Sequence, residues 1–184
     1  MDILQEFPLP IFARLLEAVF ESAPRRHSTL HGEAHWRAVA YTALELAPLV
    51  DGADPLVGLL FGLLHDSQRL NDGGDPEHGP RAAIFTRSLA ERGLLPLEPI
   101  QLDLLTTAIH HHTTEKSSRD PTVGLCWDAD RLNLWRIGVE PRVNFLSTAA
   151  AKLPERIAAH ESLPGQRESW VSLYDRLGKI YDRR

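Results

Sequence analysis

The feature that most constrains this chain is an apolar segment that ends abruptly in two polar residues. Residues 59–64 are almost wholly apolar, and His65 and Asp66 follow them directly, ahead of the polar run 67–75. Burying such a segment carries its polar end to the edge of the core, where an unpaired carboxylate is expensive. Adjacent histidine and aspartate side chains are also competent metal ligands. We therefore expect other polar side chains to meet this pair.

The rest of the chain favours a single all-α domain. Apolar residues recur at helical spacing along its 184 residues, and the alternating pattern of strands is scarce. A chain of this length can form one substantial core, and no linker divides it. We assign 1–30 to an N-terminal helical extension packing on the core, 31–140 to a metal-binding core, and 141–184 to C-terminal helices that complete the same domain.

Apolar spacing also predicts the individual helices. The expected segments are 10–21, about 31–49, 55–66, 76–92, 97–113, 121–137, two short helices at 144–152 and 154–160, and a last amphipathic helix around 170–180. The apolar face of that last helix suits either the core or a dimer. His27 and His160 have no supporting neighbours and are expected to be solvated, whereas Cys126 is expected to be buried.

A first helical hairpin would bring His35 close to His65 and Asp66. A helix climbs about 1.5 Å per residue, so 35–50 would rise roughly 22 Å and 55–65 would return roughly 15 Å. The two ends of this hairpin therefore meet at a similar level.

A second hairpin would do the same for three further histidines. Residues 78–92 and 97–111 are runs of equal length, which places His78 level with His111 and His112. Both hairpins can converge on one polar cavity.

The helix expected after residue 121 supplies a further carboxylate. Asp128 and Asp130 lie two residues apart, so they do not share a helix face. Asp130 is predicted to point inward, with Asp128 as a helix cap or as an acceptor behind the ligands. The predicted metal ligands are thus His35, His65, Asp66 and Asp130.

A mixed imidazole and carboxylate set without thiolates suits Mn, Mg, Ni, Co, Fe or Zn. Such an ion lowers the pKa of bound water and polarises an ester oxygen, so hydrolysis is the natural chemistry. His31, four residues before His35, could be a further ligand, but we favour a role at the helix start or at the rim of the pocket.

The order His35, His65-Asp66, Asp130 resembles the H…HD…D signature of the HD-domain superfamily of metal-dependent phosphohydrolases. The flanking sequences HGEAHWRAV at 31–39 and DADRL at 128–132 are also similar, and the likeness spans about 31–137. It implies an HD-domain-like helical bundle in which these four residues bind the metal. It further implies that the next cation, Arg131, contacts phosphate.

Two histidine-containing stretches resemble a particular branch of that superfamily. Glu77-His78-Gly79-Pro80 and the pair at 111–112 are similar to the extra histidines of the enzymes that hold a second metal and cleave cyclic dinucleotides. The Gly-Tyr-Pro stretch of those enzymes is missing, because 113–116 reads TTEK. The Glu-Asp pair of the alarmone-hydrolysing branch is also missing after Asp66. We therefore expect a smaller substrate.

The predicted function is metal-dependent hydrolysis of a phosphoester or phosphoanhydride in a small nucleotide-like substrate. The residues assigned to catalysis are Asp66, Arg131, His111 and His112. Those assigned to substrate binding are Arg69, Arg81, His78 and Arg131, and a second metal would lie near His78, His111 and His112. Two alternatives stay open: a non-catalytic regulatory module that binds metal or nucleotide, and a metal-free helical interaction protein.

Composition bears on partners and location. The formal net charge of −5 and the mixed distribution of charges give no nucleic-acid signal. The apolar run 56–64 is too short to span a bilayer, and residues 1–6 lack the basic start of a signal peptide. The single cysteine suits a reducing compartment, so a cytoplasmic location is expected.

Overall fold

The apolar segment forms the central helix of the fold. In the computed structural model, which describes residues 7–183, α4 spans Pro55–Leu64 and all ten of its residues are buried. Asp54 caps its N-terminus by accepting hydrogen bonds from the backbone N–H groups of Leu56 and Val57. Pro55 fills the first helical position, where the N–H would lack a partner in any case. This segment is therefore buried, as the sequence predicts.

The prediction of an all-α fold is confirmed. The described residues form eight α-helices and no strand. The helices are α2 (Leu9–Ser22), α3 (Glu33–Leu46), α4 (Pro55–Leu64), α5 (His78–Glu91), α6 (Pro99–His111), α7 (Pro121–Leu132), α8 (Pro154–Ala159) and α9 (Trp170–Tyr181). Four short 3-10 helices join them: η1 (Ala47–Leu49), η2 (Asn133–Ile137), η3 (Val143–Phe145) and η4 (His160–Ser162).

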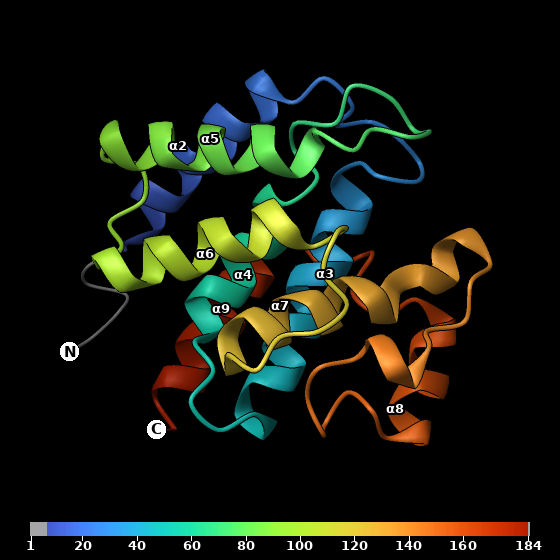
Figure 1. Cartoon of the computed structure of the whole chain (residues 1–184). Coiled ribbons are helices and arrows are strands. Elements are labelled where there is room, and N and C mark those ends of the chain that lie inside the picture. Colours follow the sequence, from blue (N-terminus) through green and yellow to red (C-terminus); the bar gives the residue numbers. More distant parts are fainter. Residues whose placement is uncertain (1–6, 184) are drawn as a thin grey trace.

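The other helices are arranged around α4 (Figure 1). Helices α3, α6, α7 and α9 all pack directly against it, and α5 packs on α6 as the second hairpin. None of the described helices is long and apolar enough to cross a membrane. The expectation about a signal peptide at residues 1–6 lies outside the part of the chain that the structure describes.

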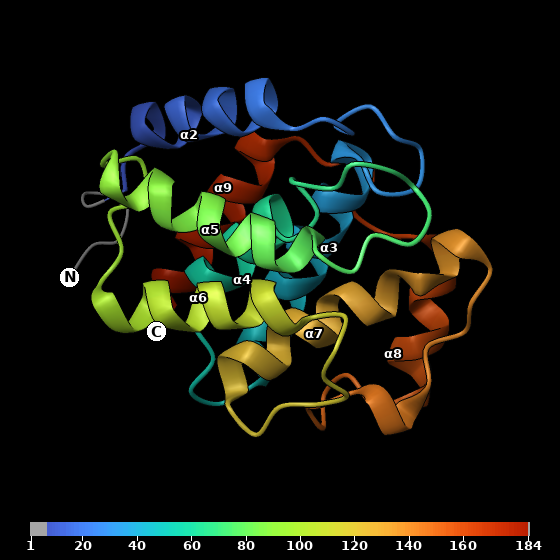
Figure 2. The same ribbon diagram turned by 45° about the horizontal axis from the view of Figure 1, so that its top comes forward.

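The N-terminal and C-terminal helices contact each other through aromatic side chains. The Phe12 ring of α2 lies 5.2 Å from Tyr174 and 6.5 Å from Trp170, both of α9, measured between ring centroids. Figure 2 shows the upper end of α9 close beneath α2. The apolar face of α9 is therefore used by the core of the monomer, where Leu173 and Leu177 are fully buried.

Two expectations about the C-terminal third are wrong. The segment 144–152 forms no α-helix; it contains the end of η3 and then bends, because the Asp128 carboxylate accepts hydrogen bonds from the backbone N–H groups of Ser147 and Thr148. His160 is buried rather than solvated. Its Nδ1 is bonded to the Arg156 carbonyl, and its Nε2 lies 3.3 Å from the Thr42 hydroxyl.

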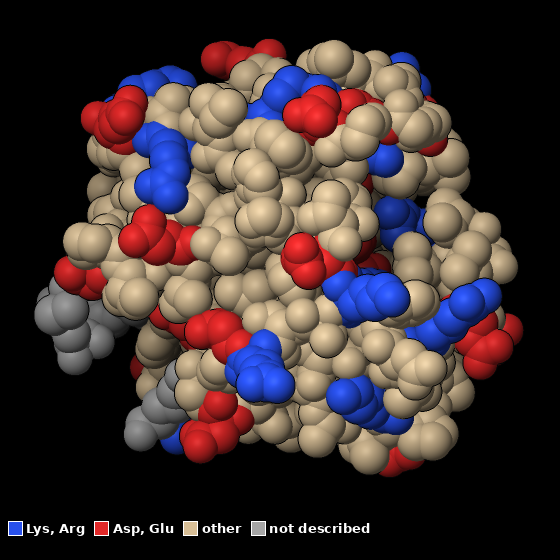
Figure 3. Space-filling view, in the orientation of Figure 1, with Lys and Arg blue, Asp and Glu red and all other residues tan. Residues whose placement is uncertain are grey.

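Charged side chains of both signs are interspersed over the face drawn in Figure 3. Lys and Arg do not form a continuous stripe on this face.

Candidate metal centre

The first hairpin brings His35 of α3 and His65, which directly follows α4, into contact. Their Nε2 atoms lie 3.2 Å apart, and both side chains are buried. The two helices approach this closely because Gly62 has no side chain. A Cβ at Gly62 would lie 2.5 Å from the Ala40 backbone nitrogen. The predicted proximity of these histidines is confirmed.

Asp66 lies at the centre of the site and is 4 % exposed. Its Oδ2 lies 3.6 Å from His65 Nε2 and 3.8 Å from His35 Nε2. Its Oδ1 lies 3.1 Å from His78 Nε2 and 3.8 Å from His112 Nε2. The two oxygens of this carboxylate thus face two different pairs of histidines.

Asp130 completes the first group. Its Oδ1 lies 3.2 Å from His35 Nε2 and 3.8 Å from His65 Nε2. Asp128 points the other way and holds the loop at 147–148 by its two hydrogen bonds. The structure therefore places Asp130 at the cluster and gives Asp128 a role in holding a loop.

The second hairpin contributes His78, at the start of α5, and His112, at the end of α6. Their Nε2 atoms lie 2.9 Å apart, and both side chains are buried. Gly79 permits this approach, since a Cβ there would lie 2.8 Å from the Ile109 carbonyl oxygen. His111 does not join the cluster. It is half-buried, and its ring lies 4.4 Å from that of His110, measured between centroids.

Backbone carbonyls fix the orientation of three of these histidines. The Nδ1 atom of His65 lies 3.1 Å from the Phe61 carbonyl oxygen, and that of His112 lies 2.7 Å from the Ile109 carbonyl oxygen. His78 Nδ1 is bonded in the same way to the carbonyl of Asp75. A carbonyl can only accept, so each Nδ1 carries a proton, and the Nε2 of each ring is turned toward the carboxylates. Metal-binding histidines commonly have this arrangement.

Burial sets the charge states of the first group. It lowers the pKa of His65 from 6.5 to about 3 and also lowers the pKa of His35, so both rings are neutral at neutral pH. Burial acts in the opposite sense on Asp66, but the surrounding histidines outweigh it and hold the pKa of Asp66 well below its ordinary value. The site thus presents neutral imidazoles beside an ionised carboxylate.

His112 differs from the other histidines. Burial alone would lower its pKa, but the hydrogen bond and charge of the Asp66 carboxylate raise it above the ordinary value. The Nε2 atoms of His112 and His78 are only 2.9 Å apart, where two facing lone pairs would repel each other, so the gap suits a proton or a metal cation.

The donor set fits a metal ion. Among residues 7–183, two groups have ligand atoms that all lie within 4.8 Å of one another: His35, His65 and Asp66, and Asp66, His78 and His112. The buried Oδ1 of Asp130 makes no hydrogen bond of adequate geometry. Neutral imidazoles, carboxylates and an unsatisfied buried oxygen are the groups that a divalent ion would coordinate. These residues could hold one ion or two.

Only one of the three predicted phosphate-binding arginines reaches the cluster. Arg69 is buried, and its Nε lies 3.8 Å from Asp66 Oδ1. Arg81 instead fastens the 67–75 loop, because it donates to the Gln68 carbonyl and to the Asp75 carboxylate.

Arg131 is turned away from the histidines. Its guanidinium donates to the backbone carbonyls of His112, Glu115, Lys116 and Phe145. Four of its N–H donors are thereby committed to the loop that follows α6 and to the end of η3. The structure gives Arg131 a role in holding that loop and does not bring it to a phosphate-binding position.

Two residues near the cluster were not assigned to substrate or metal from the sequence. His31 Nδ1 lies 3.2 Å from Asp66 Oδ2, and its side chain is 13 % exposed, so it lies at the rim as well as at the start of α3. Arg136 Nη2 lies 3.4 Å from His31 Nδ1, and its Nε donates to the Leu30 carbonyl. The four-residue spacing between His31 and His35 indicates in the sequence that His31 lies near the site. No such spacing indicates the position of Arg136, which lies in η2.

Comparison with known proteins gives no relative: no family model, no curated protein and no solved structure matches this chain. The fold and site by themselves define the class, an all-α protein with a buried histidine–carboxylate cluster that could hold metal.

Proposed function

We propose that this protein is a metal-dependent phosphohydrolase of the HD type, acting on a phosphoester or phosphoanhydride of a small nucleotide-like substrate. The observation that carries the proposal is the position of Asp66, whose two oxygens face separate pairs of histidines. One carboxylate between two sets of nitrogen ligands is an arrangement suited to two neighbouring metal ions.

The metal would supply a water of lowered pKa and would offset the negative charge of a phosphate. His35, His65, Asp66 and Asp130 would hold the first ion. Asp66, His78 and His112 would hold the second. The identity proposed for either ion is Mn, Mg, Ni, Co, Fe or Zn, since the nitrogen and oxygen ligands suit all of these in different degree.

The chain itself supplies cations and a proton donor at the edge of the cluster. Arg69 and Arg136 approach it from two sides and would offset phosphate charge that the metal does not neutralise. His31 is more exposed than the buried histidines, so a substrate reaches its ring without disturbing the core. We assign His31 to protonation of the leaving oxygen.

The substrate class follows from what the neighbouring loops lack. The residues after His112 are Thr113, Thr114 and Glu115, and no Gly-Tyr-Pro stretch of the cyclic-dinucleotide enzymes stands there. We therefore place a mononucleotide or another small phosphate ester ahead of a cyclic dinucleotide. The buried, unpaired Cys126 suits a reducing compartment, so we place the reaction in the cytoplasm.

The test combines metal analysis with a phosphatase screen. The purified protein is assayed for bound metal and then screened against nucleoside mono-, di- and triphosphates and simple phosphomonoesters, with added Mn, Mg, Ni or Co. We expect metal in the protein and turnover of at least one compound. Asp66→Ala should lose both, whereas Asp175→Ala, an exposed acid on α9, should lose neither.

Two results would count against the proposal. Full metal occupancy in Asp66→Ala would show that the cluster is not the metal site. Metal and nucleotide binding without turnover under any condition would instead favour a regulatory module.

A further inference from the structure

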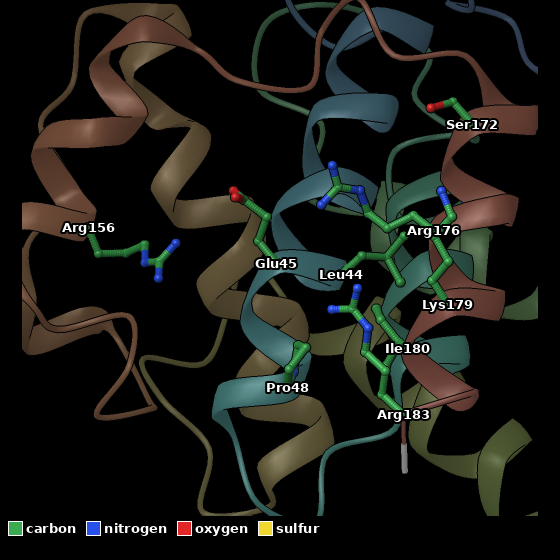
Figure 4. Close-up of a pocket in the computed structure, with 9 residues that line it drawn as sticks. All are labelled: Leu44, Glu45, Pro48, Arg156, Ser172, Arg176, Lys179, Ile180 and Arg183. Carbon is green, nitrogen blue, oxygen red and sulfur yellow. The ribbon is translucent and has the colours of Figure 1, made fainter.

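A groove at the C-terminal end of α3 is lined by basic side chains. It has a volume of about 470 Å³ and lies between α9, the C-terminal end of α3 and α8 (Figure 4). Its lining residues are Leu44, Glu45, Pro48, Arg156, Ser172, Arg176, Lys179, Ile180 and Arg183. The volume is within the range of pockets that take small molecules.

Three of its cations come from a single stripe of α9 and its C-terminal end. Arg176 and Lys179 are three residues apart and share one face of α9, and Arg183 lies two residues beyond its end at Tyr181. Arg156 lies opposite them on α8. Figure 4 shows the guanidinium groups of Arg156, Arg176 and Arg183 directed toward the space beside Glu45. The groove thus gathers positive charge from two separate helices.

Cations outnumber acids in the lining of the groove. In the part of the chain that the structure describes, none of the four cations forms an ion pair with a carboxylate, and Glu45 is the one acid in the lining. Arg176 packs over the ring of Tyr41, 4.5 Å from its centroid, which orients the guanidinium without neutralising it. Like charges held close together repel one another, so a bound polyanion would lower the electrostatic free energy of the groove. This excess stands out in a chain whose net charge is −5.

We propose that this groove binds a small polyphosphate anion, such as inorganic tripolyphosphate or the phosphate chain of a nucleoside triphosphate. Arg176 and Arg183 are seven residues apart, which corresponds to about 10 Å along a helix. That length exceeds a single phosphate and suits two or more phosphates in a row. Pro48, which is exposed, gives the groove a small apolar wall beside the cations, against which a nucleoside could pack.

The groove is a separate site from the histidine cluster. Glu45 and His35 both lie on α3, ten residues or about 15 Å apart along the helix. The proposal therefore does not depend on the hydrolytic function. A single-stranded nucleic acid is the less suitable ligand, because such chains bind along extended basic tracks with exposed aromatic rings. Here Arg176 already covers one face of the Tyr41 ring.

The test is an equilibrium titration of the full chain with inorganic tripolyphosphate, measured by calorimetry at 50 mM and at 200 mM NaCl. The key variant is Lys179→Glu/Arg183→Glu, since both side chains are exposed. We expect the double charge reversal to weaken binding by about tenfold or more, and the added salt to weaken binding to the unaltered protein. The matched control is Arg14→Glu/Arg119→Glu, which makes the same change in net charge at exposed positions outside the groove.

Further arms separate this site from the metal centre and from nucleic-acid binding. Asp66→Ala should bind tripolyphosphate as the unaltered protein does; loss of binding in that variant would assign the anion to the histidine cluster and overturn the proposal. Equal weakening by both double variants would also overturn it, since that result means a non-specific charge effect. A third result would also overturn the proposal: the protein binds an oligothymidylate through Lys179 and Arg183 but does not bind tripolyphosphate. Tighter binding of ATP than of tripolyphosphate would support a contact of the nucleoside with the apolar wall.

Discussion

Replacement of Gly62 by alanine should force α3 and α4 apart. A Cβ at this position would lie 2.5 Å from the Ala40 nitrogen and 2.6 Å from the Ala40 Cα. Ordinary contact begins near 3.4 Å, so the helices must separate by about 0.9 Å. The obstructing atoms belong to the backbone, which cannot turn aside as a side chain can. Overpacking of this kind costs about 1–3 kcal/mol and sometimes more.

The matched control lies one turn earlier on the same helix. A Cβ at Gly58 would meet the Ala43 Cβ at 3.0 Å and a Leu125 methyl group at 3.3 Å, both of them side-chain atoms. Both substitutions gain about 1 kcal/mol of helix propensity, so the difference between them isolates the close approach. We expect Gly62→Ala to be less stable than Gly58→Ala by about 1–3 kcal/mol. In a chain of this size that difference lowers Tm by about 2–12 °C.

Thermal unfolding followed by circular dichroism measures this difference, and metal titration provides a second readout. Separation of the hairpin also moves His35 away from His65, so metal should bind more weakly to Gly62→Ala than to Gly58→Ala. If Gly62→Ala unfolds at the same temperature as Gly58→Ala or above it, the account of how the hairpin is packed is wrong.

Three further outcomes are expected. Asp128→Ala leaves two backbone N–H groups at 147–148 without an acceptor. It should therefore lower the free energy of unfolding, measured in urea, by about 2–4 kcal/mol and leave the metal content unchanged. Loss of metal would contradict the role given to Asp128. The metal-free protein should lose stability as the pH falls from about 6 toward 3, because His65 becomes protonated near pH 6.5 when unfolded and only near pH 3 when folded. The slope should be about 1.4 kcal/mol per pH unit for each such histidine, and a flat urea-midpoint profile over this window would refute it. Arg136→Ala should lower kcat/KM, measured by steady-state assay, about tenfold or more. Bound metal, measured by elemental analysis, should not change. Unchanged kinetics would exclude a contact between Arg136 and phosphate.

The part of the site that sequence predicts depends on helical geometry. His35 and His65 are joined by two helices and a short turn, so counting residues at 1.5 Å each suffices to bring them together. The angle between positions two apart on a helix allows only one of Asp128 and Asp130 to point inward. These inferences use only local structure, which the sequence specifies directly.

The remaining assignments depend on tertiary contacts that no local pattern encodes. His111 and His112 are adjacent at the end of α6, where a small rotation of the helix decides which ring enters the core. Arg131 was placed near phosphate from its position beside Asp130, yet its long side chain reaches the carbonyls of a loop. His160 is buried because Thr42, far away in the sequence, lies over it.

The contact between α2 and α9 has a consequence for the order in which the protein is made. Tyr174 donates a hydrogen bond to the Phe7 carbonyl, and Phe12 packs on the same ring, so the first helix of the core is covered by the last. On the ribosome α9 emerges after every helix that carries a histidine of the cluster. Until α9 packs on α3 and α4, the core is incomplete, and a metal ion bound at the proposed site would exchange more readily than in the finished fold.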